Sequence, residues 1–124
     1  MNTLPLADLG QAPAPDLLPP NIAAWFAHRG WAPHAHQLAM LEAAARGENA
    51  LLVAPTGGGK TLAGFLPTLV DLAERPRPGL HTLYISPLKA LAVDIQRNLE
   101  TPIAELRLPI RAETRTGDTP QAKR

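Results

Sequence analysis

Residues 54–61, Ala-Pro-Thr-Gly-Gly-Gly-Lys-Thr, carry the clearest chemical signal in this sequence. Three consecutive glycines lack a Cβ atom, so their backbone N–H groups can approach an anion closely. The lysine at position 60 can reach the outer phosphates of a nucleotide, and the threonine hydroxyl at position 61 can bind Mg²⁺. This pattern predicts a loop that binds phosphate groups.

The elements on either side of the loop fit that prediction. Residues 50–53 form an apolar run typical of a buried strand, and residues 60–74 have helical periodicity. The N-terminus of such a helix offers unpaired N–H groups and the positive end of its dipole to the same anion. The general pattern has glycine where this chain has Ala54, which we interpret as a sub-family mark. The alternative is a glycine-rich turn that precedes a helix by chance.

Length and composition favour one small domain. The 124 residues are 45% hydrophobic, carry a formal net charge of +1, and include no cysteine, which excludes disulfides, zinc–thiolate sites and thiol catalysis. There is no apolar run of membrane-spanning length and no signal-peptide pattern, so we expect no membrane partner and a soluble cytoplasmic protein. Residues 1–20 are rich in proline and predict a disordered leader.

Strand and helix signals alternate after residue 48. Helices are expected over residues 22–29, 34–46, 60–74 and 87–99, with a break at Thr101-Pro102 and, as an alternative, a short helical piece that continues to residue 106. Strands are expected over residues 50–53, 80–86 and 110–115. This order predicts an α/β fold with a parallel sheet and flanking helices. Residues 54–61, 86–89 and 116–119 would then follow the carboxyl ends of the strands and share one edge of the sheet.

Three further stretches narrow the function. Residues 30–37, Gly-Trp-Ala-Pro-His-Ala-His-Gln, resemble the adenine-recognition motif Gly-Trp-x-Pro-x-x-x-Gln of superfamily 2 helicases, in particular the Lhr-like, ligase-associated DEXH-box DNA helicases. Residues 54–61 match motif I of that family, including its alanine. Residues 86–92 are similar to motif Ia, and residues 115–119 are similar to a later motif that contacts nucleic acid.

The resemblance implies that residues 21–124 are the N-terminal part of a RecA-like P-loop domain, truncated after about three strands. It implies ATP and Mg²⁺ as cofactors, DNA (single-stranded or duplex) or RNA as a partner, and a role in DNA repair beside the rest of the helicase chain and an ATP-dependent DNA ligase or nuclease. The implied cofactor-binding residues are Gln37, Pro55, Thr56, Gly57, Gly58, Gly59, Lys60 and Thr61, with Thr61 as the metal ligand; the implied nucleic-acid-binding residues are Ser86, Pro87, Lys89, Arg115, Thr116 and Gly117.

Each of these residues has a plainer interpretation. A glutamine amide can read an adenine edge, but Gln37 could equally lie on a helix surface, with Trp31 as a core anchor. Residues 86–89 could be an ordinary helix start with a solvated lysine, and residues 116–119 an ordinary turn. Ser86 has no neighbouring base of the kind that a nucleophile needs. Two histidines at positions 34 and 36 do not share a helix face, which disfavours a metal pair.

The family's Asp-Glu-x-His motif does not occur in the 124 residues. In P-loop enzymes these carboxylates hold Mg²⁺ and position the attacking water. We therefore expect an N-terminal helicase fragment without hydrolytic residues, inactive alone. One alternative is another P-loop NTPase or kinase. The other is a truncated, non-enzymatic product that binds nucleotide or nucleic acid.

Overall fold

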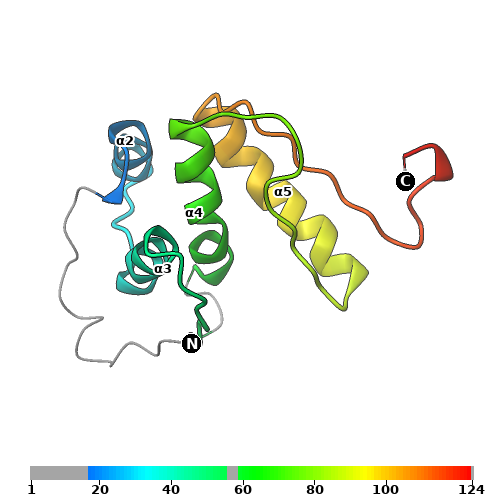
Figure 1. Cartoon of the computed structure of the whole chain (residues 1–124), viewed down its shortest axis with the longest axis horizontal. Helices are drawn as coiled ribbons and strands as arrows, with labels where there is room; N and C mark the ends of the chain where they lie inside the picture. Colours follow the sequence, from blue (N-terminus) through cyan, green and yellow to red (C-terminus); the bar gives the residue numbers. More distant parts are fainter. Residues whose placement is uncertain (1–16, 56–58, 124) are drawn as a thin grey trace.

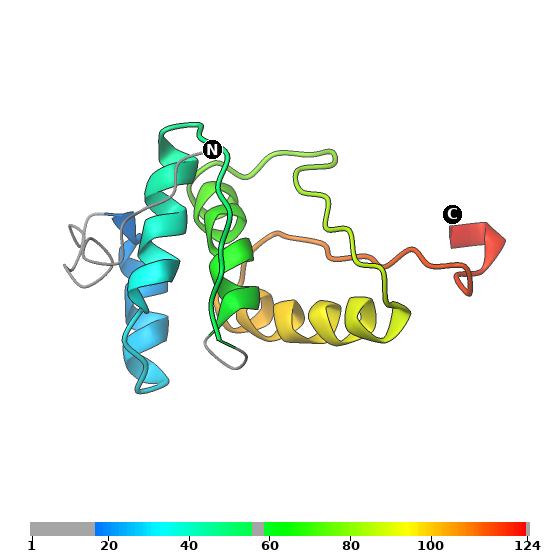
Figure 2. The ribbon, with the colours of Figure 1, turned by 90° about the horizontal axis from the view of Figure 1, so that it is seen from below.

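The computed structural model describes residues 17–55 and 59–123. Its elements are α2 (Pro20–His28), α3 (Ala35–Ala45), α4 (Lys60–Glu74), α5 (Lys89–Glu105) and a short 3₁₀ helix, η2 (Gln121–Lys123). In Figure 1, α2 and α3 lie on one side of α4, and α5 lies on its other side. Figure 2 shows α5 running away from the other helices, with the chain continuing beyond it to the C-terminus.

The first three helices confirm the periodicity of the sequence to within a few residues. Pro20 lies in the first turn of α2, where a missing N–H costs nothing, and Gly30 follows the helix with a φ of +69°. Helix α4 has the expected bounds and continues through Pro67. These signals are local in the sequence, which is why spacing alone predicts the helices.

The core lies between α2, α3 and α4. Ile22, Leu66 and Leu69 have almost no exposed surface, and α3 packs along α4. The remaining members of the buried cluster are Trp25, Phe26 and Leu41. Leu17 and Leu18 pack against this cluster although they belong to the predicted leader, whose residues 1–16 lie outside the described part of the chain.

The predicted parallel sheet is not confirmed. Within residues 17–55 and 59–123 there is no β-strand, and only Ala50 makes an isolated bridge. Residues 50–53, 80–86 and 110–115 are therefore not paired as strands, and Val53, Leu80 and Ile85 are more than 80% exposed. A strand is stable only when its backbone groups pair with a neighbour and its apolar side chains are covered. Leu80, Leu83 and Ile85 stay largely exposed, whereas Ile110 packs partly against the core and the Ala112 carbonyl accepts a hydrogen bond from Gln96.

The predicted end of the helix at Thr101-Pro102 is also wrong, because α5 runs without interruption from Lys89 to Glu105. Pro102 is the buried residue of this helix. The packing of its ring offsets the hydrogen bond that a proline cannot donate. The helix begins at Lys89, two residues later than its predicted start.

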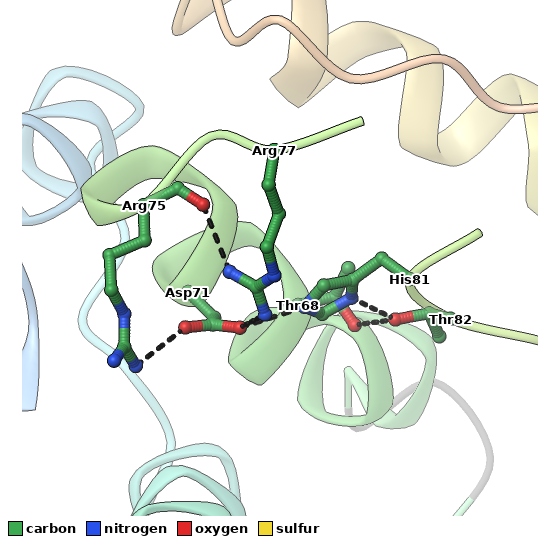
Figure 3. Close-up of polar contacts among 6 residues, drawn as sticks. All are labelled: Thr68, Asp71, Arg75, Arg77, His81 and Thr82. Carbon is green, nitrogen blue, oxygen red and sulfur yellow. Dashed lines mark hydrogen bonds and ion pairs between the residues drawn. The ribbon is translucent and has the colours of Figure 1, made fainter. Parts of the chain in front are cut away.

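Polar contacts fasten the chain after α4 to that helix. Figure 3 shows Asp71 at the centre of this group, which we call the Asp71 cluster and which also contains Thr68, Arg75, Arg77, His81 and Thr82. Arg75 and Arg77 donate to the two carboxylate oxygens at 2.9 and 2.5 Å, and His81 Nε2 lies 2.7 Å away. The hydrogen bonds from His81 and then Arg77 hold the pKa of Asp71 far below its ordinary value.

A second polar contact lies along α5. Gln96 donates from Nε2 to the carbonyl of Ala112 at 3.3 Å and accepts a hydrogen bond from the Thr114 hydroxyl. This glutamine therefore holds residues 112–114 against the helix without a strand. None of the helices in the described residues is both long and apolar enough to cross a membrane.

Candidate functional site

The phosphate loop is described only at its two ends. Thr56, Gly57 and Gly58 lie outside the described residues, whereas Pro55 precedes this gap and Gly59 follows it. Gly59 caps α4 with a φ of +78°, in the left-handed region that favours glycine. The predicted phosphate-binding residues beyond the gap thus lie on the capping turn of a helix.

Lys60 and Thr61 form the first turn of α4, and both are exposed. The first turn of an α-helix leaves N–H groups without acceptors in the helix and carries the positive end of the dipole. A cationic side chain and a hydroxyl beside such N–H groups form a donor set suited to phosphate and Mg²⁺. The described part of this site therefore fits the cofactors that the sequence predicts.

Gln37 connects this turn to the start of α3. Its side chain is only 2% exposed; Oε1 accepts the backbone N–H of His34 at 2.8 Å, and Nε2 donates to the carbonyl of Gly59 at 3.4 Å. A Cβ atom at position 59 would lie 2.8 Å from that Nε2, so a larger residue would displace the Gln37 amide and would be strained at the positive φ. Gln37 is not a surface residue, and its amide retains one N–H and one lone pair for any further contact.

A cavity of about 630 Å³ adjoins Gln37, Gly59 and Thr61. Its volume lies within the ordinary range of small-molecule sites, about 300–1,000 Å³. Trp31 is 48% exposed and lines the cavity, so the tryptophan is not the core anchor of the plainer interpretation. Helix α2 and the loop after it form one side, and the later part of α5 forms another, through Asn98, Leu99, Thr101 and Pro102.

Arg29 and Glu105 join two of these walls. The Arg29 guanidinium lies 5.3 Å from the ring of Trp25 and 5.1 Å from that of Trp31, and it donates from Nε to Glu105 at 3.0 Å. Trp25 Nε1 donates to the same carboxylate at 2.5 Å. The hydrogen bonds from Arg29 and then Trp25 lower the pKa of the Glu105 carboxyl.

Sequence analysis identified neither Arg29 nor Glu105. A usable signal existed for the first, because Arg29 follows Trp25 by four residues and shares its helix face. Glu105 lies 76 residues further along the chain, and no local sequence pattern predicts a partner at that distance. His34 and His36, which were disfavoured as a metal pair, stack with ring centroids 5.2 Å apart. No group of three or more metal-binding side chains is found among the described residues.

The predicted nucleic-acid-binding residues assemble in part. The Lys89 ammonium lies 3.2 Å from the carboxylate of Asp118 and beside Gly117, so the two motifs meet although 29 residues separate them. Within the described part of the chain, Ser86 Oγ bonds to the backbone N–H and carbonyl of Leu88, in its own turn. Pro87 and Arg115 are exposed.

The turn that follows Arg115 is braced from within. The backbone N–H of Thr116 donates to the Thr119 hydroxyl at 2.8 Å, and the Thr116 hydroxyl accepts the backbone N–H of Asp118 at 3.2 Å. The backbone of Asp118 braces this turn, whereas its carboxylate pairs with Lys89. The Thr116 N–H is thus already paired, whereas these bonds use its hydroxyl only as an acceptor.

The three predicted loops do not share one edge. The cavity beside Thr61 reaches α5 at Asn98, whereas Lys89 lies nine residues earlier, about 14 Å along the helix axis. Figures 1 and 2 both show the N-terminal end of α5 pointing away from α4. Without a sheet to align the ends of strands, the nucleotide and nucleic-acid candidates form two separate places.

Comparison with known proteins gives a consistent set of relatives. Residues 34–124 match the DEAD/DEAH box helicase family model. The chain is 44% identical over 113 residues to the Lhr helicase/probable uracil glycosylase of Mycolicibacterium smegmatis, covering 81% of this chain and 8% of the relative. It is 40% identical over 129 residues to the Lhr helicase/uracil glycosylase of Escherichia coli, covering 89% and 8% respectively.

An archaeal relative is similar over a shorter region. The chain is 43% identical over 93 residues to the ATP-dependent helicase Lhr-Core of Methanothermobacter thermautotrophicus, covering 64% of this chain and 11% of the relative. The 124 residues thus span about a tenth of the length of these curated relatives. No solved structure gives a significant match.

Proposed function

Because this chain belongs to the DEAD/DEAH box helicase family and is related to the Lhr helicases, we propose that it supplies the adenine- and phosphate-binding part of an ATP-dependent nucleic-acid helicase. Lys60 and the first turn of α4 bind the phosphates, Thr61 binds Mg²⁺, and Gln37 lies at the base. The finer features of the proposal are a RecA-like sheet completed outside this structure, DNA as the substrate, and a role in repair.

The observation that carries the proposal is the link from Gln37 to Gly59. The buried side-chain amide of Gln37, the residue expected to contact the base, donates to the carbonyl of Gly59 in the turn expected to bind the phosphates. The 630 Å³ cavity adjoins both residues. A nucleotide is an elongated ligand with a flat apolar base and an anionic end. Trp31 on one side of the cavity suits the base, and the start of α4 on another side suits the anionic end.

The nucleic-acid part of the proposal rests on the N-terminal end of α5. Lys89 and Arg115 supply cations, and Ser86, Pro87, Thr116 and Gly117 lie on the turns beside them. Cations, hydroxyls and helix N-termini are the usual partners of the phosphate backbone. Asp118 is the carboxylate that a phosphate would replace at Lys89.

The test is the replacement of Lys60. We expect Lys60→Ala to weaken the binding of Mg²⁺–ATP by about 1.5–3 kcal/mol, because a charge-assisted contact to phosphate is lost. Isothermal titration calorimetry on the folded chain measures this, with Lys89→Ala as the matched control that removes a lysine at the other place. Equal ATP affinity in wild type and Lys60→Ala would overturn the proposal.

A second candidate function is binding without turnover. The 124 residues contain no Asp-Glu-x-His motif, and a site that stabilises the ground and transition states alike does not accelerate chemistry. We expect this chain to release no phosphate above background, with or without single-stranded DNA, in a sensitive phosphate-release assay. Turnover that is lost in Lys60→Ala and needs DNA would instead show a hydrolytic group in these residues and reject this candidate.

A further inference from the structure

Arg29 occupies an unusual position for an arginine with 29% of its side chain exposed. Its guanidinium lies over two indole rings, and its Nε and Nη2 both donate to the carboxylate of Glu105. Trp25 donates its own indole N–H to that carboxylate, and the rings of Trp25 and Trp31 meet edge to face with centroids 5.6 Å apart. We call these four residues the Arg29 clamp.

The clamp lies on the wall of the cavity, and Trp25 also joins it to the buried core. Trp25, Arg29 and Trp31 all line the 630 Å³ cavity that Gly59 and Thr61 also line. Trp25 is buried and fixed, whereas Trp31 is about half exposed and sits in the loop between α2 and α3. A half-exposed loop tryptophan needs an external constraint to keep one orientation, and the guanidinium provides it on one face of the ring.

We infer that Arg29 and Glu105 are positioning residues for the base end of the nucleotide site, because together they hold the indole of Trp31 as a fixed aromatic wall of the cavity. This inference rests on the proposed nucleotide function. It adds that tight binding of the base requires the Glu105 carboxylate at the end of α5, whereas binding of the phosphates does not.

The chemistry of the four residues supports a role in binding the base that is separate from binding the phosphates. Arginine stacks on aromatic rings while donating in its plane, so one guanidinium can hold an indole face and a carboxylate at once. Glutamate at position 105 accepts from both Arg29 and Trp25, which fixes the plane of the guanidinium. Among the described residues, Lys60 and Thr61 on α4 form no hydrogen bond or ion pair with the clamp, so phosphate binding should not sense its loss.

The experiment compares two ligands that differ only in the base end: Mg²⁺–ATP and Mg²⁺–tripolyphosphate. We expect Glu105→Gln and Arg29→Lys each to weaken ATP binding by about three- to tenfold, the range of a partly desolvated cation–π contact. Tripolyphosphate affinity should stay within about twofold of wild type. Asp94→Asn is the matched control, because it removes one negative charge from the same helix at an exposed residue and should change neither affinity.

A second readout comes from fluorescence, since Trp25 and Trp31 are the two tryptophans of the chain. Trp25 is 8% exposed and Trp31 is 48% exposed, so acrylamide quenching reports mainly Trp31. We expect quenching to rise in Glu105→Gln and Arg29→Lys and to stay unchanged in Asp94→Asn. Far-UV circular dichroism selects the variants that are folded, and either variant alone suffices for the comparison.

The outcomes separate this inference from the proposed function. Equal changes in ATP and tripolyphosphate affinity, or no change in either, would overturn the positioning role while the phosphate site stands. A wild-type chain that binds ATP no more tightly than tripolyphosphate would do the same, because the wall would then contribute nothing. A wild-type chain that binds neither ligand would overturn the proposed function, and the positioning role with it.

Discussion

Within the described chain, residues 17–74 contain every buried side chain except that of Pro102. Helices α2, α3 and α4 close a core in which Ile22, Leu66 and Leu69 lose nearly all their surface. Beyond residue 75, by contrast, α5 and the extended segments place Leu80, Leu83 and Ile85 largely in solvent. Polar contacts, such as the Asp71 cluster and the Gln96 hydrogen bonds, hold this second part in place together with four apolar residues that pack partly against the core: Ile103, Leu106, Leu108 and Ile110.

The difference shows what each kind of element needs. A helix satisfies its backbone hydrogen bonds internally and needs a partner only for its apolar stripe, which a nearby helix supplies. An extended segment needs a neighbour for every backbone group. The helical part can thus be complete with local partners alone, whereas the second part keeps apolar surface that a sheet would cover.

The largest test of this contrast compares two leucines. We expect Leu66→Ala to lower the free energy of unfolding by about 2–5 kcal/mol, because Leu66 is fully buried and its truncation leaves a cavity in the core. Leu83→Ala removes the same atoms from a side chain that is 72% exposed and should change stability by less than about 0.5 kcal/mol. Urea unfolding followed by circular dichroism measures both. Similar losses would mean that the second part has a core of its own.

A second test concerns the polar link inside the helical part. Gln37→Ala removes a buried amide with two partners, and we expect ATP affinity to fall by about 1–3 kcal/mol. If Gln37 reads the base, GTP and CTP should weaken less than ATP in calorimetric titrations. Gln37→Glu keeps the acceptor for His34 but loses the donor to Gly59. Equal weakening of all three nucleotides would show that Gln37 acts only through the turn at Gly59.

The sequence predicted much of the helical part and much less of the rest. The bounds of α4 and the placement of Lys60 and Thr61 on its first turn follow from spacing within one segment. The burial of Gln37 and the pairing of Arg29 with Glu105 depend on residues 22 and 76 positions away, which no local pattern specifies. The strand prediction for residues 80–86 used the right apolar pattern, but pairing requires a neighbour that the pattern alone does not provide.

A third test examines the nucleic-acid candidates at the N-terminal end of α5. If Lys89 contacts one phosphate, Lys89→Ala should reduce the slope of log affinity against log salt by about 1 for single-stranded DNA. Asp118→Asn should raise DNA affinity slightly, because it frees Lys89 from an exposed ion pair. Fluorescence anisotropy at several salt concentrations measures both effects. Arg107→Ala, at the other end of the helix, is the control, and an equal loss of slope there would indicate only nonspecific attraction.

The smallest effect is expected at the Asp71 cluster, which fastens residues 75–82 to the core helix α4 (Figure 3). Hydrogen bonds from His81 and then Arg77 lower the pKa of Asp71, so the contribution of the cluster is complete above the ordinary carboxyl range, near about pH 4. As the pH falls through the lowered folded pKa, Asp71 gains a proton and the contribution is lost. We expect nuclear magnetic resonance titration of the Asp71 carboxyl carbon to give a midpoint well below the ordinary aspartate value of about 3.9.

Arg77→Gln should move the Asp71 midpoint toward the ordinary value, and Asp71→Asn should speed thermolysin cleavage within residues 80–84 at neutral pH while global unfolding changes little. Glu74→Gln should alter neither observation. The reason for this separation is the contrast between the two parts of the molecule, since none of the hydrophobic side chains that pack against the core cluster lies in residues 75–82. If Asp71→Asn instead lowered the unfolding midpoint as strongly as Leu66→Ala, the Asp71 cluster would belong to the core, and the division at residue 75 would be wrong.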